Sequence, residues 1–157
     1  MQDVVIVEAC RTAVGSFGGS LKPLDADDLA VSVIKGALQR TGLDPLQVDE
    51  VILGHCRQSS DMSNTARDAA LRAGIPEEVP ANTVMCACAS GMLAVNNAVN
   101  AIRTGQAEVV LAGGTESMSN AIFYLSNARW GVGTGTTQLK DSLTEAQFCS
   151  QPQDIYG

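Results

Sequence analysis

The feature that most constrains the fold is a regular alternation of short apolar runs with longer segments of helical periodicity. The apolar runs, each short enough for one strand, cover residues 4–7, 51–53, 82–87 and 109–112. The segments between them that repeat apolar side chains at helical spacing cover residues 25–40, 64–73 and 90–103. Strands that alternate with helices form a parallel sheet with right-handed crossovers. The sequence therefore predicts an α/β fold in the order β-α-β-α-β-α-β.

The residue types within these segments predict which sides are buried. The first run, residues 4–7, is continuously apolar and β-branched, which is typical of a strand covered on both faces. One apolar side of the first helix is expected to consist of Leu29, Val33, Ala37 and Leu38. The third helix is expected to have an apolar side of Val95, Val99 and Ile102, next to a thin face of Ala94, Ala98 and Ala101 that allows close packing.

Bulk properties exclude several classes of function. The net charge of −7 argues against nonspecific nucleic-acid binding and against an anionic membrane surface. No apolar stretch approaches the ~20 residues that span a bilayer, and no signal peptide is evident. Five cysteines without regular spacing argue against a disulfide framework. We therefore expect a globular protein of the reducing cytoplasm.

Cys88 is the strongest candidate for a reactive group, because it falls where the third strand turns into the third helix. A helix N-terminus has unpaired N–H groups and a partial positive charge, which favour a thiolate over a thiol and could hold an oxyanion. Small neighbours, Ala87, Ala89 and Gly91, leave room for a substrate carbonyl. The pattern alone leaves open a second interpretation, a buried structural cysteine.

Other polar residues near the predicted strand ends have weaker signals. His55 follows the second strand, at the sheet edge where α/β proteins bind ligands, but a lone histidine favours a structural hydrogen-bonding role. Glu116 could act as an acid or base, and a structural role is favoured for it too. A zinc site would need Cys86 and Cys88 plus distant partners, so we expect no metal.

Several segments together resemble the N-terminal part of the thiolases, which are acyl-CoA acetyltransferases. They are VVIVEACRTAVGSFGGSL, VDEVILG, ARDAALRAGIPEEVPANTV, CASGM, AVNAIRTGQAEVVLAGGTESMSNA and ARWG, and they cover nearly the whole chain in order. The resemblance implies that residues 1–119 form an incomplete thiolase N-terminal α/β domain that lacks its last strand. Residues 120–157 would begin the loop domain.

The resemblance also implies a function. Cys88 would be the acyl-accepting nucleophile in the reversible condensation and thiolysis of 3-ketoacyl-CoA, with coenzyme A thioesters as substrates and no further cofactor. The chain departs from the family at Ala89, where glycine is usual, at Met85, where asparagine is usual, and at Cys86, a position that is commonly polar. These departures put the acyl chain length in question.

A thiolase draws its other catalytic groups, an activating histidine and a second cysteine, from a second half that has no match here. We therefore expect this chain to be inactive alone and to require a complementary C-terminal half. We also expect an oligomer, with a homodimer contact near residues 82–86. The open alternatives are a ketoacyl synthase, a non-catalytic module that binds acyl-CoA or lipid, and a structural subunit.

Overall fold

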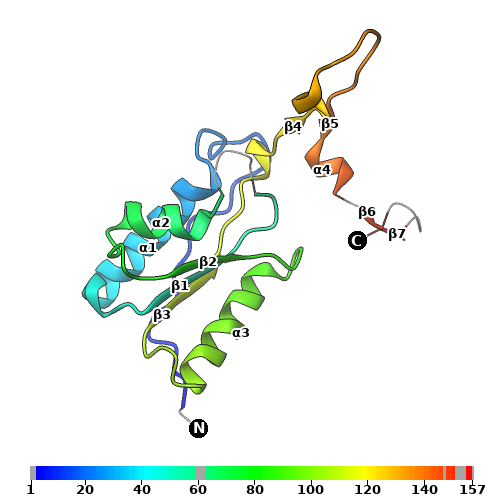
Figure 1. Ribbon diagram of the computed structural model, residues 1–157. Coiled ribbons are helices and arrows are strands. Elements are labelled where there is room, and N and C mark those ends of the chain that lie inside the picture. The colour runs from blue at the N-terminus through cyan, green and yellow to red at the C-terminus, as the bar shows by residue number, and fades with distance from the viewer. Residues whose placement is uncertain (1–2, 59–62, 147, 151–154, 157) are drawn as a thin grey trace.

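The centre of the molecule is a parallel sheet of three strands. The computed structural model describes residues 3–58, 63–146, 148–150 and 155–156. Within them, β1 (Glu50–Gly54) lies between β2 (Ala81–Val84) and β3 (Val110–Gly114), and both pairings are parallel (Figure 1). The predicted α/β class and its parallel sheet are therefore confirmed, and three of the four expected strands are present in that sheet.

Three helices cover the two faces of this sheet. Helices α1 (Ala26–Thr41) and α2 (Thr65–Ala73) pack together on one face, and α3 (Ser90–Arg103) packs on the other (Figure 1). The side chain of Asp25 caps α1 at its start, and left-handed Gly42 ends it. All three helices begin and end within two residues of their predicted bounds.

The side chains of β1 divide between the two faces with the period of two that a strand imposes. Val51 and Leu53 join the larger core under α1 and α2, whereas Ile52 packs against Ala94 and Ala98 of α3. All three β1 side chains are buried, which is expected for the middle strand of a parallel sheet.

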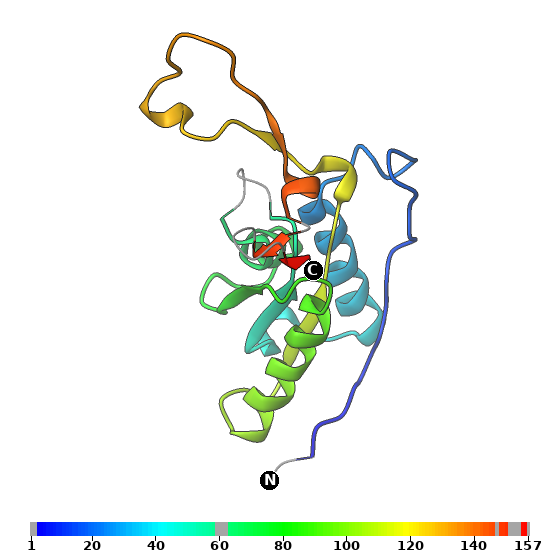
Figure 2. The same ribbon diagram turned by 90° about the vertical axis from the view of Figure 1, so that its right-hand side faces the viewer.

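The strand predicted at residues 4–7 is not formed, and this prediction is wrong. Val5, Ile6 and Val7 are 75–81% exposed, and the segment runs beside α1, apart from β3 (Figure 2). Contacts to α1 hold it there: Glu8 pairs with Arg40 at 3.1 Å, and the Cys10 Sγ lies 3.6 Å from the Val33 carbonyl. A strand needs a neighbour for its backbone groups, and the described residues place none beside this run.

The buried face of α1 differs from the prediction. Its buried apolar residues are Ala26, Ala30, Val31, Ile34 and Leu38, so of the predicted set only Leu38 is buried and the other three are half-buried. In α3 the buried face is that of Ala94, Ala98 and Ala101, which agrees with the close packing expected of it. The neighbouring face is partly exposed: Val95 is 37% exposed, and Val99 and Ile102 are half-buried.

Segment 115–120, which follows β3, is fastened to the chain that leads into α1. The Thr115 hydroxyl donates to the Ala26 carbonyl at 2.6 Å, and the Ser117 hydroxyl donates to the Leu24 carbonyl at 2.9 Å. The Asn120 amide donates to the carbonyls of Lys22 and Leu24. These bonds place the start of α1 at the carboxyl edge of the sheet.

Beyond residue 122 the chain leaves this body and forms an arm (Figure 1). The elements of the arm are β4 (Phe123–Tyr124), η3 (Ala128–Trp130), β5 (Lys140–Asp141), α4 (Ser142–Glu145), β6 (Phe148–Ser150) and β7 (Ile155–Tyr156). Its strands form two antiparallel pairs, β4 with β5 and β6 with β7. Two short helices precede the arm, η1 (Pro45–Gln47) and η2 (Met118–Asn120). Among the described residues, no helix has the length and apolar character needed to cross a membrane.

Candidate active site

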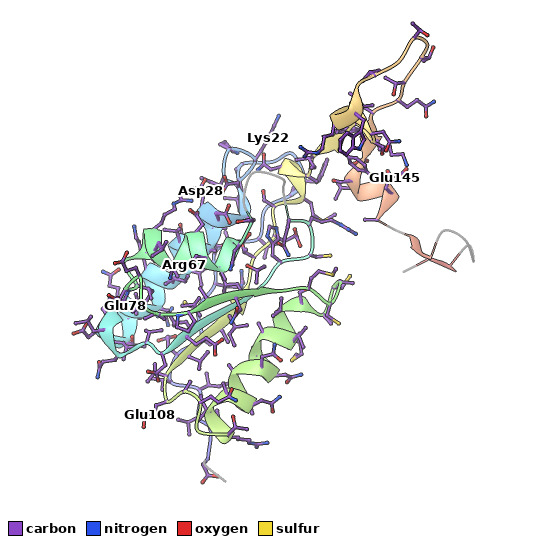
Figure 3. The ribbon with its side chains drawn as sticks, in the orientation of Figure 1. Lys22, Asp28, Arg67, Glu78, Glu108 and Glu145 are labelled. Atoms are coloured by element: carbon purple, nitrogen blue, oxygen red, sulfur yellow. The ribbon has the colours of Figure 1, made fainter. Side chains whose placement is uncertain are left out.

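Cys88 lies in the turn between β2 and α3, hereafter the thiol turn (residues 85–89). Its side chain is exposed, and α3 begins two residues later at Ser90. Sulfur atoms gather around this turn at the carboxyl edge of the sheet (Figure 3). The predicted position just before the first helical turn is therefore confirmed, and the alternative of a buried cysteine does not fit the structure.

The start of α3 leaves donors free near the thiol. Ala89 occupies the N-cap position and makes no side-chain cap hydrogen bond. In the part of the chain that the structure describes, the Cys88 backbone N–H has no acceptor. Unpaired N–H groups at a helix start favour a negative charge, either a thiolate or an oxyanion.

The backbone of the thiol turn is held in an unusual conformation. Ala87 has a φ of +46°, in the left-handed region that costs an L-residue roughly 1–2 kcal/mol. The Ala87 carbonyl accepts from the Ser90 hydroxyl at 2.7 Å and from the Ser90 N–H at 3.2 Å. The same hydroxyl accepts from the Cys86 N–H at 2.9 Å. Ser90 is only 4% exposed, so it bonds both residues from inside the fold.

Glycines let the first turn of α3 lie directly on the sheet. A Cβ on Gly54 would overlap the backbone of Ser90 and Gly91. A Cβ on Gly114 would lie 3.1 Å from the Gly54 carbonyl oxygen and 3.3 Å from the Gly91 Cα. The ends of β1 and β3 therefore form a side-chain-free floor beneath the thiol turn.

A second polar group at the same sheet edge is closed to solvent. His55 is 4% exposed; its Nδ1 lies 2.9 Å from the Thr65 hydroxyl, and its Nε2 lies 3.3 Å from the Glu116 carboxylate. Its backbone N–H donates to the Val84 carbonyl at the end of β2. Both ring nitrogens are thus used within the fold, which supports the structural role that the sequence favours for His55.

Two carboxylates beside His55 have pKa values shifted in opposite directions. Burial acts to raise the pKa of Glu116, but the His55 ring and the backbone N–H groups of Cys56 and Arg57 outweigh it, and the net pKa is lowered. Burial raises the pKa of Asp27, although the neighbouring Thr65 hydroxyl acts against the shift. Asp27 is 4% exposed, and its Oδ1 has no partner among the described residues. We call Asp27, His55, Thr65 and Glu116 the buried cluster.

The remaining candidate sites have less support. Among residues 3–58, 63–146, 148–150 and 155–156, no group of three or more His, Cys, Asp or Glu side chains could hold a metal ion. One surface hollow of about 580 Å³ lies between residues 9–13 and Arg40, and another of about 290 Å³ lies between residues 56–58 and the base of the arm. Neither is lined by Cys88, whose thiol faces an open surface.

Sequence reasoning missed two residues that shape this edge. Ser90 has a local signal, because a hydroxyl at the first position of a helix that lacks a capping side chain can bond the preceding turn. Asp27 has no such signal. An acidic residue in a first helical turn ordinarily faces solvent near the positive helix end, and only the packing of α1 against α2 buries this one.

Comparison with known proteins identifies the family of the chain. The family model described as the thiolase N-terminal domain matches residues 4–155. An acetyl-CoA acetyltransferase of Pseudomonas aeruginosa is 50% identical over 145 residues, which are 92% of this chain and 37% of that protein. One of Cupriavidus necator is 50% identical over 143 residues, covering 91% and 36%.

Solved structures give the same result. The crystal structure of the Bacillus anthracis acetyl-CoA acetyltransferase has a TM-score of 0.79 and 46% sequence identity, covering 83% of this chain and 33% of that one. The α/β fold thus occurs in proteins named as acetyl-CoA acetyltransferases, which are acyltransferases. The chain belongs to the thiolase family and corresponds to its N-terminal domain. It spans about a third of the length of the relatives it matches.

Proposed function

We propose that this chain supplies the acyl-accepting nucleophile, Cys88, of a thiolase that acts on 3-ketoacyl-CoA. The single observation that carries the proposal is the exposed thiol of Cys88 two residues before α3. The printed names of the relatives, acetyl-CoA acetyltransferase, support the acyl-transfer chemistry. Substrates are coenzyme A thioesters, with no further cofactor.

The proposed reaction proceeds in two balanced steps. The Cys88 thiolate attacks the C3 carbonyl carbon of a 3-ketoacyl-CoA, and the bond between C2 and C3 breaks. The electron pair stays on C2, which takes a proton, so that acyl-Cys88 and acetyl-CoA are formed. The thiolate of free coenzyme A then attacks the carbonyl carbon of acyl-Cys88, and the bond from that carbon to the Cys88 sulfur breaks. This step releases a shortened acyl-CoA and restores the Cys88 thiolate.

The described residues support part of this chemistry. The Cys88 N–H, which has no acceptor within the described chain, is placed to contribute to an oxyanion hole. His55 is buried in hydrogen bonds to Thr65 and Glu116, so it does not serve as the base for Cys88. A base and a proton donor for C2 must therefore come from the length of the relatives that these residues do not span.

The open side of the sheet supports a complementary part of the same assembly. We propose that a strand from that part fills the space between β3 and the exposed run at residues 4–7, and that residues 120–157 begin a separate loop domain. Self-association through β2, an edge strand that is followed by the 62% exposed Met85, would form the homodimer. The described cysteines are free, which supports a reducing compartment such as the cytoplasm.

The test is reconstitution. The remaining two thirds of the Pseudomonas aeruginosa relative, expressed as a separate polypeptide, is mixed with this chain and with acetoacetyl-CoA and coenzyme A. We expect a stable complex, formation of acetyl-CoA, and an acetyl group on Cys88 in trapped intermediates by mass spectrometry. Cys88→Ser should abolish both signals, whereas Cys86→Ser, two residues away in the same turn, should keep activity within about threefold.

Two results would overturn the proposal. One is a stable complex that binds acetyl-CoA without forming an acyl-enzyme, which would favour the alternative of an acyl-CoA-binding module. The other is an acyl-enzyme in which the acetyl group lies on a residue other than Cys88.

A further inference from the structure

We infer that Ser90 is a positioning residue that holds the left-handed backbone of Ala87 and so places the Cys88 thiol at the start of α3. The inference deepens the proposed function and rests on it for its catalytic meaning. Its geometry is independent of any activity, because it concerns the turn itself.

The first step is the conformation of Ala87. Its φ of +46° is one of two positive values among the non-glycine residues that the structure describes. Alanine has no side-chain polar group that could stabilise this conformation locally, as asparagine or aspartate can. Something outside the residue must therefore hold it there.

The second step is the pair of bonds that the Ser90 hydroxyl makes across the turn. It donates to the Ala87 carbonyl at 2.7 Å and accepts from the Cys86 N–H at 2.9 Å. These two backbone groups flank the strained residue on either side, so a change in the Ala87 torsions would break one or both bonds. A single buried hydroxyl thus fixes the entry and the exit of the bend.

The third step is that Ser90 itself is fixed. It is 4% exposed, and its backbone lies against Gly54, where no Cβ could fit. Gly54 belongs to the middle strand of the sheet, the most enclosed part of the fold. The sheet therefore fixes Ser90, and Ser90 in turn fixes the backbone that positions Cys88. The exposed residues of the turn contribute little to that positioning.

The consequence is a coupling between two residues that can be measured. With Ser90→Ala, Ala87 can relax toward common torsions, and the thiol moves away from its place at the positive end of the α3 dipole. With Ala87→Gly the left-handed torsions carry no penalty, so the hydroxyl is needed less. The loss caused by Ser90→Ala should shrink when position 87 is glycine.

The experiment measures the alkylation rate of Cys88 by iodoacetamide, over a range of pH, in the full 157-residue chain. All variants carry Cys86→Ser, so that Cys88 is the only thiol in the turn, and mass spectrometry reads the label at Cys88. Circular dichroism follows folding. The matched control is Ser32→Ala, which removes an exposed serine hydroxyl bonded to the Asp28 carbonyl within α1.

We expect Ser90→Ala to slow alkylation at neutral pH about fivefold and to shift the pH profile upward, with the circular dichroism spectrum retained. The same change in the Ala87→Gly background should slow it less than about twofold, and Ser32→Ala should leave it unchanged. If Ser90→Ala alone unfolds the chain, the alkylation rates of Ala87→Gly and of the Ala87→Gly, Ser90→Ala double variant are compared instead. A difference of less than about twofold supports the inference, and a larger one overturns it.

Either of two results would overturn the inference. The first is an alkylation rate for folded Ser90→Ala within twofold of the parent. The second is an equal loss in the alanine and glycine backgrounds, which would mean that Ser90 acts without reference to Ala87. Thiolysis plays no part in these measurements, so failure of the proposed function would leave their outcome intact.

Discussion

The buried cluster and the thiol turn lie at the same edge of the sheet, but the first encloses its histidine and the second exposes its cysteine. In the buried cluster, His55 and Glu116 use their polar atoms on each other and on neighbouring backbone. In the thiol turn, the backbone of residues 86 and 87 is bonded from below by Ser90, while the Cys88 side chain is exposed. The first arrangement stabilises the loops, and the second leaves a nucleophile available.

The difference shows that proximity to a ligand-binding edge does not by itself make a residue reactive. His55 follows a β1 strand end and would be a natural candidate for a base. Its ring is closed by partners from α2 and from the loop after β3. Cys88 has no such enclosure, because the small residues around it cannot cover it. Each of the following predictions tests one side of this contrast.

The largest expected effect separates the two groups by chemistry. In the reconstituted complex, Cys88→Ser should lower thiolysis of acetoacetyl-CoA by at least about 10³-fold, because it removes the nucleophile. His55→Gln, which keeps a donor toward Glu116, should lower it by less than about tenfold. Initial rates at saturating substrate measure both. A loss of activity for His55→Gln as large as that for Cys88→Ser would contradict the structural role of His55.

The next effect concerns Gly54, which directly precedes His55 in the chain and lies against the backbone of Ser90 and Gly91. Gly54→Ala places a Cβ into the backbone of Ser90 and Gly91, so it should lower the free energy of unfolding by about 3 kcal/mol. Urea denaturation measures the change. The matched control is Gly36→Ala in α1, where a Cβ meets nothing within 4 Å; it should raise stability by about 0.5–1 kcal/mol.

A smaller effect is expected from Glu116, the carboxylate of the buried cluster whose pKa is lowered. The native pKa of Glu116 is lowered, so its stabilising contribution is present above the unfolded value near 4.3 and is lost as pH falls through the native pKa. Glu116→Gln should therefore reduce the free energy of unfolding by about 1.5 kcal/mol at pH 7, and the difference should shrink toward pH 3. A difference that does not vary with pH would contradict this account.

The smallest expected effect is that of Asp27, whose substitution should raise the free energy of unfolding instead of lowering it. The native pKa of Asp27 is raised, so the folded chain binds this proton more tightly than the unfolded chain does. Its contribution to stability therefore falls as pH rises from about 4 through the native pKa. Asp27→Asn should raise the free energy of unfolding by about 0.5–1 kcal/mol at pH 7, with the gain vanishing near pH 3. Destabilisation at pH 7 would show that the ionised carboxylate is needed.

Much of the fold and one feature of the site followed from local spacing. The alternation of apolar runs and periodic segments predicted the three helices and the strands β1, β2 and β3. The position of Cys88 before α3 followed from where helical periodicity begins after the strand. Such features depend on residues a few positions apart, so neighbouring side chains in the sequence are enough to predict them.

The rest depended on partners distant in sequence. The Glu116 carboxylate meets the Cys56 N–H across 60 positions, and the sequence offers no signal for that pairing. The run at residues 4–7 has the composition of a buried strand, yet it stays exposed because a strand forms only beside another. Likewise, α3 buries its alanines because the glycine ends of β1 and β3 permit close approach.

The sequence by itself therefore determined the order of strands and helices and the chemical identity of the group at the head of α3. Tertiary structure alone decided that His55 and Asp27 are enclosed, that residues 4–7 lie unpaired, and that a serine hydroxyl holds the turn before Cys88. Torsional preference and side-chain periodicity are properties of short segments. Burial and hydrogen-bond partners arise only when distant segments are brought together.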